Sequence, residues 1–334
     1  MPSAFKIAGA FAPILTPFMP DGGSIDWGSY RRHLAFLSQG DPFGKETGLE
    51  GIVVLGTNGE FGQLTTAERL AMVEATLTAG TRLAVIVGGM VPDSPEDTLA
   101  FVQRVVEYAD QVAAVLVAPP FYNVVAAGGV VPEDVVVDFY RHLARVQDRV
   151  PLLLYNVPVP PEGPMTAPVT PDVVAALRDE VAIVGVKDST ARLENIPAYL
   201  RAKPGLKVLV GSDHVVAGGL AQGAVGSITA CGNIFPSAVL AVYQARPGPA
   251  RQAAQDELSR LRRVIELIPG KQVAIQKLLL YHLGVVARLS PVRDLSKGLT
   301  TSERDQILAA LEEAAAGLVI NQEIQAAIRS LPGS

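Results

Sequence analysis

Two polar residues stand at the ends of consecutive apolar segments, where they could take part in catalysis. Tyr155 ends the segment 152–155 and Lys187 ends the segment 182–187. Partial burial lowers the pKa of a lysine and favours the neutral amine that attacks carbonyl carbons. A phenol nearby can move protons on and off oxygen. Two alternatives stay open from these residues alone: Lys187 can pair with Asp188 or a helix end, and Tyr155 can be an amphipathic rim residue.

The other lysines are poorer candidates for an amine nucleophile. They lie before apolar segments, in loops or on predicted helices: Lys6, Lys45, Lys203, Lys207, Lys271, Lys277 and Lys297. Only Lys187 follows an apolar segment directly. We therefore expect Lys187 to be the nucleophile.

Polar turns follow other apolar segments in the same way. Residues 56–60 read Gly-Thr-Asn-Gly-Glu, residues 119–123 contain Tyr122, and residues 211–213 read Gly-Ser-Asp. Backbone N–H groups in a glycine-flanked turn, together with the side chains of Thr57 and Asn58, can hold a carboxylate. Turns of this kind are common, and most of them only reverse the chain.

Eight apolar segments along the chain must position these polar residues. Each is rich in Val, Ile, Leu and Ala, is bounded by Gly or Pro, and precedes a segment with helical spacing of its apolar residues. The eight are residues 8–16, 51–56, 83–88, 113–118, 152–155, 182–187, 207–211 and 226–230. Strands that are apolar on both faces are typical of a parallel sheet covered by helices.

Eight alternating strand and helix units predict an α/β fold, namely a closed (β/α)8 or TIM barrel. An open, doubly wound sheet is disfavoured because Thr16-Pro17-Phe18, after the first strand, is no glycine fingerprint. We predict that residues 1–235 form the barrel and that residues 236–334 form a C-terminal helical extension packed on it. The extension has no residues typical of an active centre, so a packing or oligomerisation role is expected.

Composition excludes several classes of function. The net charge is −5 without a basic block, which disfavours nucleic acid as a partner. The four histidines and the single Cys231 lack metal-binding spacing, so no metal is expected. No uninterrupted apolar segment is long enough for a membrane span. One cysteine fits a reducing compartment, and we expect a cytoplasmic protein.

Taken together, the strand ends resemble the dihydrodipicolinate synthase / N-acetylneuraminate lyase family of pyruvate-dependent class I aldolases. The resemblance covers about residues 11–295. It rests on five segments in the order and spacing of the family: Leu15-Thr16-Pro17-Phe18, Gly56-Thr57-Asn58-Gly59-Glu60, Pro120-Phe121-Tyr122-Asn123, Tyr155-Asn156-Val157-Pro158 and Gly185-Val186-Lys187-Asp188-Ser189.

The resemblance implies a role for each matching residue. Lys187 would form a Schiff base with pyruvate, and Tyr155 would be the general acid and base. Thr57 would link Tyr155 to Tyr122, which in this family reaches into the site of a neighbouring subunit, so a homodimer or homotetramer is implied. Thr57 and Asn58 would hold the substrate carboxylate, and the backbone of Ile228 would contact it. The resemblance implies neither a metal nor an organic cofactor.

Departures from the family pattern bear on the aldehyde partner. Family members that make the dihydrodipicolinate precursor carry an arginine just after the Tyr-Asn-Val-Pro segment, where it grips the carboxylate of aspartate semialdehyde. Here residues 159–166 contain no arginine but include Glu162, and neither proline nor glutamate replaces a bidentate carboxylate grip. Asn58 stands where many relatives have threonine or serine.

We therefore predict reversible aldol cleavage of a 4-hydroxy-2-oxo acid to pyruvate and an aldehyde. The substrate would be of the 4-hydroxy-2-oxoglutarate or 2-keto-3-deoxy sugar acid type. One alternative is 4-hydroxy-tetrahydrodipicolinate synthase, which joins pyruvate and aspartate semialdehyde. A second is a non-catalytic protein that binds 2-oxo acids. A nucleotide-dependent oxidoreductase is disfavoured because the glycine pairs at residues 88–89 and 218–219 lack dinucleotide-site spacing.

Overall fold

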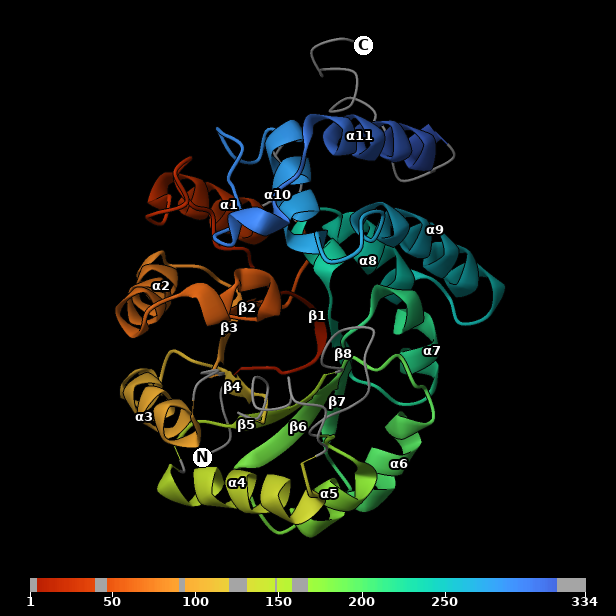
Figure 1. Cartoon of the computed structure of the whole chain (residues 1–334). Helices are drawn as coiled ribbons and strands as arrows, with labels where there is room; N and C mark the ends of the chain where they lie inside the picture. Colours follow the sequence, from red (N-terminus) through yellow and green to blue (C-terminus); the bar gives the residue numbers. More distant parts are fainter. Residues whose placement is uncertain are drawn as a thin grey trace.

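A computed structural model describes residues 5–39, 47–89, 94–119, 131–147, 149–157 and 168–316 of the chain. Its centre is a closed barrel of eight strands that follow one another around the barrel in sequence order (Figure 1). All neighbouring strands are parallel, including the first and the last. The predicted (β/α)8 barrel is confirmed.

Each strand overlaps one of the predicted apolar segments. The strands are β1 Gly9–Ala12, β2 Gly51–Val54, β3 Ala84–Gly88, β4 Ala114–Val117, β5 Leu152–Asn156, β6 Ile183–Asp188, β7 Lys207–Val210 and β8 Gly226–Ile228. Strand β1 is shorter than predicted, and β5 and β6 each end one residue later. Nearly every strand residue is buried, because one face of the sheet fills the barrel and the other is covered by helices.

Helices surround the barrel in Figure 1. They are α1 Trp27–Gln39, α2 Thr66–Thr78, α3 Pro95–Val105, α4 Glu133–Val146, α5 Pro171–Ala176, α6 Asn195–Ala202, α7 Val216–Ala221 and α8 Pro236–Gln244. Side-chain caps begin two of them: Thr65 and Glu68 form a capping box on α2, and Ser94 caps α3.

Three further helices follow: α9 Pro249–Ile265, α10 Gln272–His282 and α11 Thr301–Ala316. They lie together at one side of the barrel, beyond α8 (Figure 1). The α8 helix itself contacts β1 and α9. The domain division at residue 235 stays a prediction. None of the helices in the described ranges is long and apolar enough to cross a membrane.

The barrel closes where β1 pairs with β8, at a pair of glycines. Gly9 lies opposite Gly226, and a Cβ atom on Gly226 would lie 2.4 Å from the carbonyl oxygen of Gly9. Gly9 also has a φ of +91°, a conformation that favours glycine. The close approach of these two strands therefore requires glycine.

Candidate active site

Lys187 and Tyr155 face one another across two neighbouring strands. They are register partners in the β5–β6 pair, and Lys187 Nζ donates a hydrogen bond to Tyr155 Oη at 3.1 Å. The same Nζ lies 4.2 Å from the centre of the Tyr155 ring. Both side chains are buried, with 6% and 3% of their surface exposed. The structure thus places an amine beside a phenol in a site screened from bulk water.

The surroundings of Tyr155 favour release of its phenolic proton. Burial raises the pKa of this phenol, but the charge of Lys187 and hydrogen bonds from Thr57, Ser189 and Lys187 outweigh burial and hold the pKa below its usual value of 10. Thr57 Oγ1 lies 3.4 Å from Tyr155 Oη. A phenol in this setting is suited to proton transfer.

The Asp188 carboxylate makes its hydrogen bonds with residues other than Lys187. Its carboxylate accepts from Thr190 Oγ1 at 2.7 Å and from Asn195 Nδ2 at 2.8 Å, and Asn156 Nδ2 approaches it at 3.3 Å. Over the described ranges, Lys187 and Asp188 form no ion pair. The structure therefore does not favour the alternative in which Lys187 only neutralises its neighbour.

The turn after β2 brings Thr57 and Asn58 to the same end of the barrel. Residues Thr57–Gly59 form the short 3-10 helix η1, closed by hydrogen bonds from Gly59 N to Gly56 O at 2.9 Å and from Glu60 N to Thr57 O at 3.1 Å. The N–H groups of Thr57 and Asn58 are therefore not used in closing the turn. An oxyanion can use such groups as donors.

Helix α10 reaches this turn from the C-terminal extension. Lys277 is 2% exposed and forms an ion pair with Glu60, and its Nζ also donates to Pro291 O at 2.8 Å. Burial lowers the pKa of Lys277 to about 8, although Glu60 acts to raise it. Arg293 N donates to the other oxygen of Glu60 at 2.9 Å. Glu60 itself has a left-handed φ of +56°, so its backbone is held in a strained conformation.

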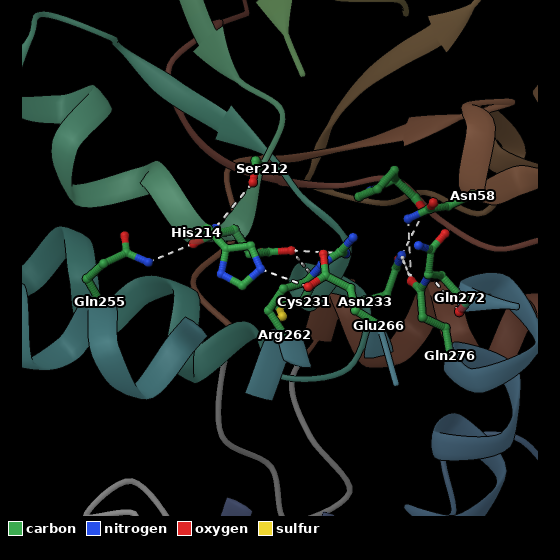
Figure 2. Close-up of polar contacts among 12 residues, drawn as sticks. Asn58, Ser212, His214, Cys231, Asn233, Gln255, Arg262, Glu266, Gln272 and Gln276 are labelled. Atoms are coloured by element: carbon green, nitrogen blue, oxygen red, sulfur yellow. Dashed lines mark hydrogen bonds and ion pairs between the residues drawn. The ribbon is translucent and has the colours of Figure 1, made fainter. Parts of the chain in front are cut away.

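A second link between α10 and the turn runs through three side-chain amides. Figure 2 shows Gln276 between Asn58 and Asn233, with hydrogen bonds to both. Asn58 Nδ2 lies 3.4 Å from Gln276 Oε1, and Asn233 Nδ2 lies 3.1 Å from the same oxygen. Two separate contacts from α10 therefore hold the segment that carries Thr57 and Asn58.

An ionic cluster at the end of β7 joins the barrel to α9 (Figure 2). Asp213, 1% exposed, accepts from Arg262 at 3.4 Å and from Cys231 N at 3.3 Å. Glu266 accepts from Arg262 Nε at 2.7 Å and from His214 Nε2 at 2.8 Å. Burial raises the pKa of Glu266, but His214 and Arg262 outweigh it and lower the pKa to about 2. The charged side chains of the cluster pair with one another, which suits a structural role, although Asp213 Oδ1 is buried without a hydrogen-bond partner in the described part of the chain.

Comparison with known proteins identifies the family. The model of the dihydrodipicolinate synthetase family matches residues 6–314. The chain belongs to this family. It is accordingly a lyase, as the resemblance in the sequence predicted.

Individual relatives of this synthetase-family lyase agree with that assignment. A DapA-like lyase from Chloroflexus aurantiacus is 31% identical over 78% of this chain and 82% of its own length. A 4-hydroxy-tetrahydrodipicolinate synthase from Methanospirillum hungatei is 28% identical over 71% of this chain and 75% of its own. A prophage protein of the family from E. coli K12, crystallised with pyruvate, superposes with a TM-score of 0.77 at 22% identity and covers 92% of this chain and 98% of its own.

Of the six residues predicted for the site of this lyase, the structure brings together Lys187, Tyr155 and Thr57. Asn58 lies next to Thr57, and Ile228 ends β8 as a buried residue opposite Phe11. Tyr122 lies outside the described residues. Within the described ranges, no group of three or more His, Cys, Asp or Glu side chains is placed to hold a metal ion.

Two further residues at the site of this synthetase-family lyase were not assigned from the sequence. Ser189 hydrogen-bonds the phenol of Tyr155, and its position two residues after Lys187 was a signal that could have found it. Gln276 left no such signal, because a glutamine on a predicted helix far along the chain has nothing to connect it with residue 58.

Proposed function

We propose that this lyase forms a Schiff base between Lys187 and pyruvate or a closely related 2-oxo acid, and reversibly cleaves a 4-hydroxy-2-oxo acid. The observation that carries the proposal is the 3.1 Å contact between Lys187 Nζ and Tyr155 Oη at the mouth of the barrel. An amine nucleophile with an adjacent proton-transfer group is the arrangement that imine chemistry needs. Membership of the family supports the same reaction class.

In the proposed reaction, the neutral amine of Lys187 attacks the 2-oxo carbon. Tyr155 donates a proton to the carbinolamine oxygen, water leaves, and an iminium forms. Tyr155 then takes the proton of the 4-hydroxyl group, and the bond between carbons 3 and 4 breaks. Its electrons pass into the iminium, which leaves an enamine of pyruvate and a free aldehyde. Protonation of the enamine and hydrolysis of the imine release pyruvate and restore Lys187.

The carboxylate of the 2-oxo acid is proposed to lie against the turn after β2. The N–H groups and side chains of Thr57 and Asn58 would bind it, with the backbone of Ile228 opposite. The position of Thr57, 3.4 Å from the phenol of Tyr155, supports this proposal because it puts the carboxylate site beside the reacting amine. A titration with pyruvate of variants in this turn tests it.

The aldehyde partner is the least constrained part of the proposal. Absence of an arginine after Tyr155-Asn156-Val157-Pro158 favours a 4-hydroxy-2-oxoglutarate or 2-keto-3-deoxy sugar acid substrate. Relatives named 4-hydroxy-tetrahydrodipicolinate synthase support condensation with aspartate semialdehyde instead. Turnover measured with aspartate semialdehyde, glyoxylate and sugar-derived aldehydes separates these two substrate classes. The non-catalytic alternative predicts reversible pyruvate binding without an imine.

Borohydride reduction tests the nucleophile. In the unsubstituted protein, pyruvate and borohydride should leave a covalent adduct on the peptide that contains Lys187, detected by mass spectrometry. Lys187→Ala should form no adduct and lose turnover by several orders of magnitude, because no other group supplies the amine. Lys203→Ala is the matched control, since Lys203 is a partly buried amine that binds backbone oxygens of Leu177 and Glu180. An adduct that persists in Lys187→Ala would refute the assignment.

Two further parts of the proposal rest on the family, and a third rests on the composition. We propose a homodimer or homotetramer in which Tyr122 completes the site of a neighbouring subunit, and sedimentation of the protein tests this. Catalysis would use no metal and no organic cofactor, so dialysis against a chelator should leave turnover unchanged. A cytoplasmic location is proposed from the single cysteine, Cys231.

A further inference from the structure

We infer that Gln276, on helix α10, is a positioning residue: it orients the side chain of Asn58 and thereby sets the affinity of the site for the carboxylate of its 2-oxo acid. This inference rests on the proposed function. It assigns a role in substrate binding to the C-terminal helical extension, for which the sequence suggested only packing or oligomerisation.

The Gln276 side chain is fully buried and hydrogen-bonded at both ends. It is 0% exposed. Its Oε1 accepts from Asn58 Nδ2 at 3.4 Å and from Asn233 Nδ2 at 3.1 Å, and its Nε2 lies 3.3 Å from Gln272 O. An amide oxygen has two lone pairs, so both are used. Buried and satisfied in this way, Gln276 has one orientation.

One backbone carbonyl determines whether each side-chain amide in this series presents its NH2 group or its oxygen to the next. Pro13 O can only accept, and Asn233 Nδ2 donates to it at 2.8 Å. The second N–H of that amide donates to Gln276 Oε1, so Gln276 presents its oxygen, rather than its NH2 group, to Asn58. Asn58 must then present its own NH2 group in return. Figure 2 shows, one after the other, Asn233 of the 3-10 helix η7 (Ala230–Asn233), Gln276 of α10 and Asn58 of the turn after β2.

Asn233 is held on its backbone side as well. His33 Nε2 lies 3.3 Å from Asn233 O, and burial lowers the pKa of His33 to about 4. The imidazole is therefore neutral near pH 7, and the nitrogen facing the carbonyl is the one that carries hydrogen. Titration of His33 near neutral pH therefore does not disturb this contact.

The second N–H of the Asn58 side-chain amide bears on how the ligand binds. One N–H of its side-chain amide is directed to Gln276, and in the described ranges its second N–H has no acceptor. A carboxylate oxygen bound at the turn is the acceptor that this N–H lacks. Without Gln276 the amide can turn its oxygen towards the substrate, which would repel a carboxylate instead of binding it.

A double-mutant cycle tests the inference. Gln276→Leu, Asn58→Ala and the double variant are compared by the pyruvate concentration that gives half-maximal borohydride trapping. Loss of one positioning hydrogen bond is expected to raise this concentration about 3- to 10-fold while the adduct yield at saturation is kept. The double variant should be no worse than Asn58→Ala, because Gln276 acts through Asn58.

Leu279→Ala is the control on the same helix. Leu279 is 0% exposed, so its truncation lowers the melting temperature by opening a cavity but should leave the half-saturating pyruvate concentration unchanged. The inference is overturned if Gln276→Leu leaves that concentration unchanged, if the two single effects multiply in the double variant, or if Leu279→Ala reproduces the shift.

Failure of the proposed function would look different. In that case the unsubstituted protein forms no adduct at any pyruvate concentration. Calorimetric titration of the same variants with lactate, which has the carboxylate but no 2-oxo group, then tests the positioning role of Gln276. Weaker lactate binding in Gln276→Leu than in Leu279→Ala supports the positioning role without imine chemistry. Equal binding in both, or none in the unsubstituted protein, overturns it.

Discussion

At the scale of single residues, the site depends on a register match between two strands. Tyr155 and Lys187 each end an apolar segment, and pairing of β5 with β6 sets them directly opposite one another. Because both are buried, the charge of Lys187 acts on the phenol with little screening by water. The same pairing that builds the barrel therefore also lowers the pKa of Tyr155.

Removing the phenolic hydroxyl of Tyr155 should impair proton transfer while the protein stays folded. Tyr155→Phe is expected to slow exchange of the pyruvate methyl protons for deuterium about 10²- to 10⁴-fold, because the proton-transfer group is lost. This exchange reports enamine formation and needs no knowledge of the aldehyde. Proton NMR in heavy water measures it directly.

Tyr30→Phe is the control for losing a buried tyrosine hydroxyl. The Tyr30 hydroxyl contacts Thr76 Oγ1 at 2.6 Å between α1 and α2, away from the site. This variant should lose some stability and keep its exchange rate. Exchange in Tyr155→Phe at the rate of the unsubstituted protein would exclude Tyr155 as the proton carrier.

At this scale the sequence predicts the role of a residue where its neighbours in the chain carry the signal. Lys187 and Tyr155 stand out because each ends an apolar segment of the sequence. Ser189 lies in the same motif, but its contact with Tyr155 cannot be predicted from the sequence, because its hydroxyl reaches the phenol only once β5 and β6 are paired. The role of Gln276 could not be predicted for the same reason, because its contact with Asn58 joins residues that are far apart in the chain.

At the scale of elements, strands were predicted more accurately than the contacts of the later helices. A strand buried on both faces must be apolar throughout, so its limits are visible in the composition of the segment. Polar contacts between elements leave no such pattern. The cluster formed by Asp213, His214, Arg262 and Glu266 joins the end of β7 to α9, and its members are up to 53 positions apart in the chain.

The charge of Glu266 should make docking of α9 sensitive to acid. Its pKa in the folded protein is about 2, against 4.5 for the free side chain, so its stabilising effect is complete above pH 4.5 and is lost as the pH falls towards 2. Glu266→Gln should lower the free energy of unfolding by about 1–2 kcal/mol at pH 7, after allowing for solvent screening of a partly exposed group.

Urea unfolding at several pH values measures this difference. The gap between Glu266→Gln and the unsubstituted protein should close as the pH falls from 4.5. Glu257→Gln, on helix α9 that Glu266 caps and without an ion pair in the described part of the chain, should show little effect. A gap that stays constant down to pH 3 would contradict the assigned role of the Glu266 charge.

At the scale of the whole molecule, the C-terminal extension and the barrel meet at the catalytic end. Lys277 of α10 pairs with Glu60 of the turn after β2, and their side chains are 2% and 9% exposed. This contact spans more than two hundred residues of chain. Periodicity within a helix indicates which face is buried, but it does not indicate against which distant loop, so this contact could not be predicted from sequence patterns.

Breaking the ion pair between Lys277 and Glu60 should lower the free energy of unfolding substantially. Lys277→Met leaves the Glu60 carboxylate buried without its main counter-charge, and about 3–5 kcal/mol of unfolding free energy should be lost. The double variant Glu60→Gln, Lys277→Met should recover part of that loss because no unpaired charge remains. Urea unfolding at pH 7 compares them.

Lys271→Met, at the N-cap of the same helix, is the matched control. Its partner is Glu303, and both side chains are 22% exposed, so solvent screens the pair and the loss should be about 1 kcal/mol or less. Equal losses for Lys271→Met and Lys277→Met would show that burial does not set the strength of the Lys277 pair.

Closure of the barrel between Gly9 and Gly226 also has a consequence for how the protein is made. The ribosome releases β1 early, but its partner β8 emerges only after most of the barrel has been synthesised. Until then the β1 edge carries unpaired N–H and C=O groups on an apolar strand, a surface that favours association with other chains. Aggregation of nascent chains should therefore be greatest for fragments that stop just short of residue 226.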